Sequence, residues 1–206
     1  MKRTTTATGL LALAAMLVLG VFAGSASAGG GPNSFFLWTG PLPGLILVLS
    51  DNLQVFKATS ETEIVCRHYR GHGTASNGTA MTTKSVTIVG IYTSCIANGI
   101  VTAEVSPAEY TISADGSVAI VGKPIVVTVP ELGCSLKIES GPPNNNLRLL
   151  LFLNKTKAIL VHVEVGKIAS LASGGLCGTA GELKPEGTYR GLLLVSVHGG
   201  NVHWVK

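Results

Sequence analysis

Short runs of Val, Ile and Thr recur along most of this chain, and Gly, Asn-Gly and Asp-Gly separate them. Apolar and polar residues alternate within many runs, a period of two that is typical of β-strands with one face on a core. Helix signals are scarce. The pattern predicts an all-β protein, an antiparallel β-sandwich or a partly closed β-barrel, in which residues 45–206 form a single domain.

The runs that we expect to form strands are short and lie between turn residues. They cover residues 45–49, 53–57, 63–69, 85–92, 100–105, 109–113, 117–121, 125–129, 147–153, 158–165, 192–198 and 202–205.

A hairpin around residues 114–116 can be set in register from the sequence. A two-residue turn would mix polar and apolar residues on each face. A three-residue loop with Gly116 in the left-handed conformation instead gathers the large apolar side chains on one face, so we expect that loop. The expected cross-strand pairs are Tyr110 with Ile120 and Ile112 with Val118.

Two more hairpins are expected. At the C-terminus, a Gly199-Gly200 turn would place Val197 opposite Val202 and Ser196 opposite His203. The hairpin between residues 147–153 and 158–165 is apolar on nearly both faces, so we expect it in the middle of the structure.

The N-terminus has the three zones of a secretory signal peptide. Lys2 and Arg3 precede an apolar run from Leu10 to Ala23, and small residues end at Ala28. We expect residues 1–28 to be a signal peptide that is cleaved after Ala28. The run is shorter than the roughly 20 residues that span a bilayer, so we expect a secreted or extracytoplasmic protein without a transmembrane segment after cleavage.

Composition excludes two classes of protein. Apolar residues make up 46% of the chain, which rules out intrinsic disorder. The formal net charge of +4 falls to +2 when Lys2 and Arg3 leave with the predicted signal peptide, because 13 basic and 11 acidic residues remain. A charge that small and scattered argues against a nucleic-acid partner.

Four cysteines, Cys66, Cys95, Cys134 and Cys177, follow the predicted cleavage site. An even number in an oxidising compartment favours two disulfides, with three possible connectivities. We prefer Cys66–Cys95 with Cys134–Cys177, because each pair then joins one half of the domain. No C-x-x-C pair occurs, so we expect no zinc site and no cofactor.

The densest polar cluster, here called the basic strip, consists of Arg67, His68, Arg70 and His72. It is either a solvated strand edge that discourages aggregation or a contact for an anion or polysaccharide. An arginine between the histidines argues against a metal site.

Residues 29–44 form a leader rich in Gly and Pro that carries Phe35, Phe36 and Trp38. These aromatic side chains are either an exposed contact surface or part of a strand that folds back and covers the domain.

No catalytic set converges in the sequence. Ser196 and His203 lack a nearby acid, and neither G-x-S-x-G nor a phosphate-binding loop occurs.

Residues 36–41, 92–95, 106–110 and 133–135 resemble corresponding motifs in a group of exported, cysteine-paired β-domain proteins of soil actinobacteria. The resemblance implies export, a β-domain and paired cysteines. It implies no activity, ligand or functional residue.

We therefore expect a non-catalytic extracellular or cell-envelope module with a binding or structural role and an envelope or polysaccharide component as partner. The alternative is a small secreted hydrolase whose site is assembled from distant residues, where His68, His198 or His203 meets a carboxylate. A third hypothesis is a partner of another protein, which a large exposed apolar patch would indicate.

Overall fold

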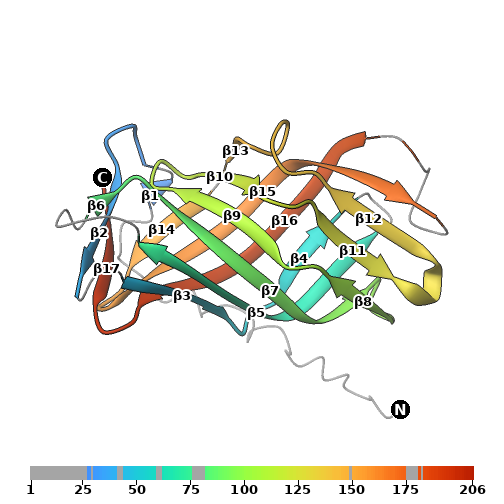
Figure 1. Cartoon of the computed structure of the whole chain (residues 1–206), viewed down its shortest axis with the longest axis horizontal. Coiled ribbons are helices and arrows are strands. Elements are labelled where there is room, and N and C mark those ends of the chain that lie inside the picture. Colours follow the sequence, from blue (N-terminus) through green and yellow to red (C-terminus); the bar gives the residue numbers. More distant parts are fainter. Residues whose placement is uncertain are drawn as a thin grey trace, which may run out of the picture.

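The computed structural model describes residues 27–28, 30–40, 44–58, 62–75, 82–148, 150–174, 181 and 183–206, and most of these residues lie in β-strands (Figure 1). All the strand pairings are antiparallel. The one helical element among the described residues is a 3₁₀ turn, η1, at Pro130–Leu132. The prediction of an all-β protein is confirmed.

The strands are β1 Ser27–Ala28, β2 Phe35–Thr39, β3 Gly44–Ser50, β4 Gln54–Lys57, β5 Glu63–Ala75, β6 Thr82–Thr83, β7 Ser85–Ala97, β8 Val101–Val105, β9 Ala108–Ser113, β10 Ser117–Val121, β11 Ile125–Val129, β12 Cys134–Ile138, β13 Leu147–Arg148, β14 Leu150–Asn154, β15 Ala158–Ser173, β16 Leu183–Val197 and β17 Asn201–Val205.

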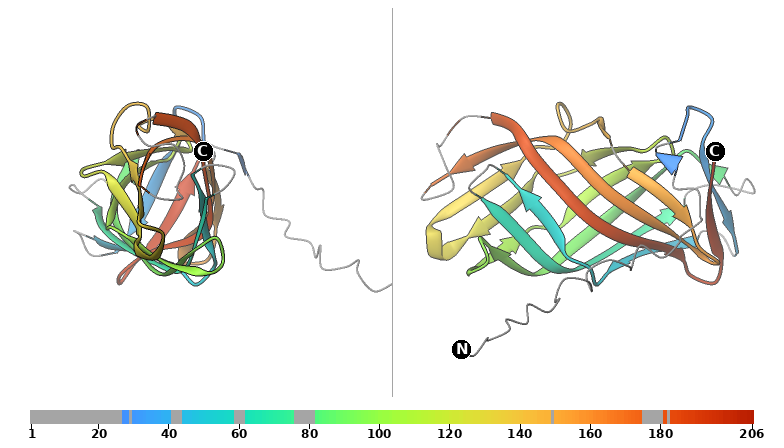
Figure 2. Two further views of the ribbon diagram at one scale, coloured as in Figure 1. Left: turned by 90° about the vertical axis from the view of Figure 1, so that its right-hand side faces the viewer. Right: turned by 180° about the vertical axis from the view of Figure 1, so that it is seen from behind.

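The main sheet is partly ring-like. Its strand path runs from β7 through β8, β11, β12, β15, β16 and β3 to β5, and the pairing of β5 with β7 joins the two ends of this path. Seen end-on, the strands surround a common interior (Figure 2, left). Alternate residues of each strand therefore point into this interior and form the core.

Four long strands carry the ring. They form two pairs, β5 with β7 and β15 with β16. The other edge of each long strand pairs with two shorter strands, one after the other along its length. In the view from behind, β15 and β16 cross the molecule side by side (Figure 2, right).

Beyond β7 the sheet also continues through β9 to β10, and the segment between β12 and β13 bridges β10 and β15. On one side, Ile120 of β10 donates its N–H to Asn144 O and accepts a hydrogen bond from Gly141 N–H, both at 3.0 Å. On the other side, the Asn144 side chain bonds Ala169 of β15, accepting from its N–H at 2.8 Å and donating to its carbonyl at 2.9 Å. Asn144 is completely buried, so this one residue links the two strands.

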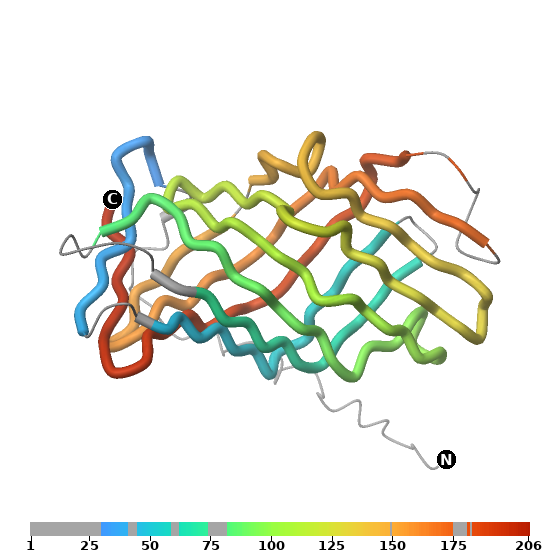
Figure 3. The backbone as a smooth tube through the Cα atoms, in the orientation of Figure 1, coloured from blue at the N-terminus to red at the C-terminus, as the bar shows by residue number. Residues whose placement is uncertain are grey.

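A second, smaller sheet covers one end of the ring. It contains β17, β2 and β6, and Figure 3 shows β2 in blue beside β17 in red at that end. The Trp204 ring stacks on Phe152 with centroids 5.4 Å apart, and its Nε1–H donates to Ala114 O at 2.8 Å. Asn154 fixes the same strand by bonding both backbone groups of Trp204.

Most of the local predictions agree with the structure. The expected strand runs coincide with observed strands, and β14 and β15 form the expected hairpin. The three-residue loop is confirmed, because Tyr110 pairs with Ile120, Ile112 pairs with Val118 and Gly116 has a φ of 87°.

The predicted C-terminal hairpin is wrong. β17 pairs with β2, where Val202 lies opposite Trp38 and Trp204 opposite Phe36. The physical reason is that β15 and β3 already occupy the two edges of β16 near Val197, so no edge remains for β17.

We predict that Asn144→Ala lowers the free energy of unfolding by about 3 kcal/mol, because it removes three hydrogen bonds and leaves buried backbone groups without partners. Urea unfolding measures this change. The neighbouring Asn145 is exposed, so Asn145→Ala should change stability by less than about 0.5 kcal/mol. Equal effects of the two substitutions would contradict the role given to Asn144.

Candidate functional site

The aromatic leader is part of the core. Phe36 is 2% exposed and Trp38 is 4% exposed, and Phe36 packs edge-on against Phe152 at a centroid distance of 5.5 Å. Phe35 is half-buried. Phe36 and Trp38 are therefore not available as surface contacts, and the leader adopts the alternative expected for it, a covering strand.

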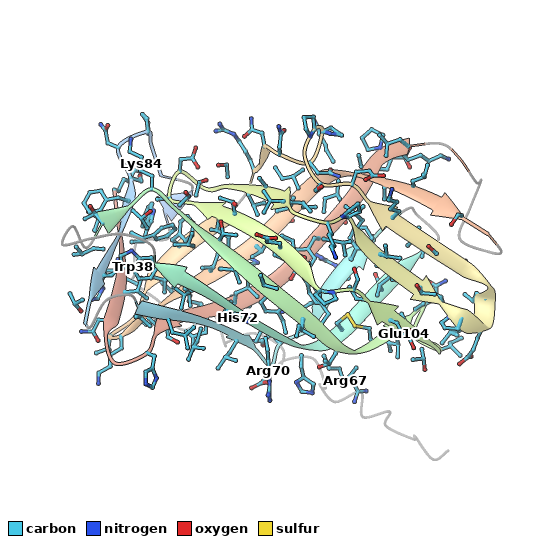
Figure 4. All side chains as sticks on the ribbon, viewed as in Figure 1. Trp38, Arg67, Arg70, His72, Lys84 and Glu104 are labelled. Carbon is cyan, nitrogen blue, oxygen red and sulfur yellow. A yellow bond between two sulfur atoms is a disulfide. The ribbon has the colours of Figure 1, made fainter. Side chains whose placement is uncertain are left out.

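The basic strip lies on the outside of β5. Cys66 and Tyr69 are both buried, whereas Arg67 and His68 between them are both exposed. The pairing of β5 with β7 keeps its register across this point. Arg70 and His72 are also exposed, and Figure 4 shows Arg67, Arg70 and His72 along the lower side of the molecule.

His68 meets a carboxylate on the surface. Its Nδ1 lies 3.3 Å from Asp51 Oδ1, and the two side chains are 49% and 96% exposed. This is a solvated pair and not the enclosed cleft that the hydrolase hypothesis requires. Ser196 lies opposite Ala158, while His203 lies opposite Leu37 in the other sheet, so the expected Ser196–His203 pair does not form.

The Cys66–Cys95 disulfide is confirmed. The two residues are direct cross-strand neighbours on β5 and β7, with an S–S distance of 2.04 Å. Cys177 lies outside the described residues, so its pairing with Cys134 stays a prediction.

All four tyrosines of the chain gather inside the ring, and we call Tyr69, Tyr92, Tyr110 and Tyr189 the tyrosine cluster. The hydroxyl oxygens of Tyr92 and Tyr110 lie 2.7 Å apart, and Tyr92 also donates to Tyr189 at 3.4 Å. Tyr189 donates in turn to Gln54 Oε1. The rings of Tyr69 and Tyr92 pack with centroids 4.9 Å apart.

Two glycines make room for this cluster. Gly71 of β5 and Gly90 of β7 face each other in register, and the Tyr69 ring lies over them. A Cβ at Gly90 would come within 2.3 Å of the Tyr69 hydroxyl, closer than real atoms approach. The glycines at positions 71 and 90 are therefore explained by packing.

Burial is the largest cause that raises the pKa of each tyrosine above its ordinary value. Neighbouring phenol groups raise the pKa of Tyr69, Tyr92 and Tyr110 further, because one phenolate disfavours a second nearby. The cluster therefore consists of neutral phenols over the physiological range.

The interior leaves little room for a ligand. A cavity lined by the tyrosine cluster and aliphatic side chains has a volume of about 90 Å³. Engineered apolar cavities that bind benzene are larger, about 150 Å³, and pockets for drug-sized molecules begin at about 300 Å³. The interior is thus a packed core with little room for a ligand.

The outer face carries an apolar feature that crosses four neighbouring strands. In the strand register Leu153 lies beside Leu160, Leu160 beside Leu194, and Leu194 beside Leu49. We call these four residues the leucine row. Neighbouring strands are about 4.8 Å apart, so the row is about 14 Å long.

The leucine row points away from the core. The residues that alternate with it, among them Phe152, Ile159, Val195 and Val48, are buried inside the ring. Leu49 is 48% exposed and Leu194 is 40% exposed, and Leu153 and Leu160 are half-buried.

The sequence contains the signal for this row, in the hairpin that we expected in the middle of the structure. Its strand β15 is paired along both edges, but one apolar face of the hairpin is not covered. Leu151, Leu153 and Leu160 give the hairpin of β14 and β15 its second apolar face, and that face lies on the outside. Joining it to Leu49 and Leu194 required strand pairings between segments far apart in the chain.

Comparisons with protein-family models, curated proteins and solved structures find no match to this chain. The described residues contain no group of three or more metal-ligating side chains. They also contain no helix with the length and hydropathy needed to span a bilayer.

The tyrosine cluster predicts a distinctive alkaline titration. The folded protein keeps its phenolic protons above pH 10, where the unfolded chain loses them, so the free energy of unfolding should fall as the pH rises past about 10. Tyrosinate absorbance should appear only together with loss of the β-sheet circular dichroism signal. The protein unfolded in guanidinium is the control and should titrate near pH 10. A tyrosine that ionises near pH 10 with the fold intact would contradict this account.

Proposed function

We propose that the protein is an exported, non-catalytic module that binds the lipid surface of the cell envelope through the leucine row. The observation that carries the proposal is the alignment of four outward leucines across β14, β15, β16 and β3. Apolar side chains aligned in this way on a surface are typical of an interaction site, whereas exposed leucines scattered singly need no explanation.

Export is supported by two features. The first residues have the order of zones that is typical of a signal peptide, and the disulfide between Cys66 and Cys95 is compatible with an oxidising, extracytoplasmic compartment.

Basic side chains flank the leucine row. Arg70 lies directly opposite Leu49 in the register and extends the row onto β5, and His72 lies opposite Leu47 on the same face. Lys157 is exposed in the turn at the other end, between β14 and β15. Apolar side chains bordered by cations are suited to a surface that offers both acyl chains and anionic head groups.

The chemistry of the leucine row favours a lipid over a polysaccharide or another protein as the partner. Sugar hydroxyls pressed against leucines would lose water without gaining hydrogen bonds, which disfavours a polysaccharide. Protein interfaces are rich in Trp and Tyr, and leucine is under-represented among the residues that carry their affinity. Here both tryptophans and all four tyrosines lie inside.

The double substitution Leu160→Ser with Leu194→Ser tests the proposal. Each leucine is expected to contribute about 1 kcal/mol of apolar contact, so the pair should weaken binding to purified envelope and to lipid vesicles roughly 30-fold. Co-sedimentation at low and high salt measures the effect, and circular dichroism checks the fold.

Leu183→Ser is the matched control, because Leu183 is 45% exposed on the same strand but lies outside the row. It should bind as the wild type does. If the double variant still pellets, and high salt abolishes that pelleting, binding would be assigned to the basic strip. This result would overturn the proposal. A wild-type protein that stays in the supernatant with every lipid would overturn it as well.

A further inference from the structure

A groove runs along the outer face beside the leucine row. It has a volume of about 520 Å³, within the range of small-molecule sites, and its lining includes Leu151, Leu160, Leu192 and the turn residue Leu53. The groove exists because β16 changes partners: it pairs with β3 through Leu194–Val197 and with β4 through Thr188–Arg190. The turn that joins β3 to β4 stands between these two pairings and forms one wall.

The polarity of the groove changes along the strands. The leucine row is entirely apolar, and the next outward positions on β14, β15 and β16 are Leu151, His162 and Leu192. Two residues further along, Glu164 lies opposite Arg190. The distance from the leucine row to Arg190 is four residues of strand, about 13 Å. An apolar end and a charged end at this separation fit an amphiphilic ligand.

The basic side chains in the groove are available to a ligand. Arg190 and His162 are both exposed and line the groove. In the part of the chain that the structure describes, neither of them forms a salt bridge, although Glu164 faces Arg190 across the ladder. An arginine guanidinium can bind a phosphate or carboxylate with two parallel hydrogen bonds, and an imidazole N–H adds a further donor.

We propose that this groove holds one acyl chain of a membrane lipid and that Arg190 and His162 bind its anionic head group. This inference rests on the proposed function, since it names the lipid class that the outer face recognises. Arg190 determines the preference for an anionic head group, and the leucines supply contact that does not depend on the head group.

Vesicle flotation tests the inference, with vesicles of phosphatidylcholine alone and vesicles that also contain phosphatidylglycerol. The wild type should bind both and prefer the anionic vesicles. Arg190→Gln should weaken binding to the anionic vesicles about fivefold and leave binding to the neutral vesicles unchanged. Glu164→Gln removes the opposing carboxylate and should strengthen binding to the anionic vesicles.

Arg67→Gln is the matched control for net charge. Arg67 is an exposed arginine on β5 that does not line the groove, so its substitution should have less effect than Arg190→Gln. Equal losses from the two arginine substitutions would overturn the assignment to the groove. Thermal unfolding of each variant verifies that the fold is intact.

The outcomes separate the inference from the proposed function. If the wild-type protein binds both kinds of vesicle equally, and neither Arg190→Gln nor Glu164→Gln changes binding, the head-group assignment is overturned. The proposed function would still stand. Wild type that floats with neither vesicle overturns both. A third outcome is that the protein binds no vesicles but forms a concentration-dependent dimer, which Leu194→Ser dissociates. The face would then be assigned to a second copy of the chain, and both the inference and the proposed function would be overturned.

Discussion

Asn144 holds together the part of the ring where strand pairing is interrupted. Its backbone carbonyl accepts from β10 and its side chain satisfies both backbone groups of Ala169 on β15. An unpaired sheet edge would leave buried polar groups without partners and would offer a template for aggregation. With this edge covered, the ring encloses the tyrosine cluster, whose Tyr69 ring packs over Gly71 and Gly90.

A filled interior has a consequence for function. β2 and β17 cover one end, and the central cavity of about 90 Å³ is smaller than the engineered cavities that bind benzene, which favours a binding surface on the outside. The same strand pairings that place Ile159 and Val195 inside place Leu160 and Leu194 side by side outside. The leucine row and the neighbouring groove are therefore products of the register that closes the ring.

Local features could be predicted from the sequence, and long-range pairings could not. Alternation and turn residues located most strands and the Gly116 loop, because both depend on neighbours in the chain. The sequence predicts the wrong partner for β17, because distant segments, β15 and β3, fill the edges of β16. Asn144 stands in a run of three asparagines, and nothing local distinguishes it as the buried one. The leucine row joins residues as far apart as Leu49 and Leu194, so only the folded register brings it together.

The most direct test of the lipid-binding face is a methyl NMR spectrum recorded with vesicles that carry a spin-labelled lipid. The account predicts that the methyl signals of Leu49, Leu160 and Leu194 broaden strongly. Ile100 and Leu183 are also exposed, at 87% and 45%, but lie outside the leucine row, and their signals should stay sharp. Equal broadening of all exposed methyl groups, or broadening of Ile100 and Leu183 alone, would contradict the assignment of lipid binding to this face.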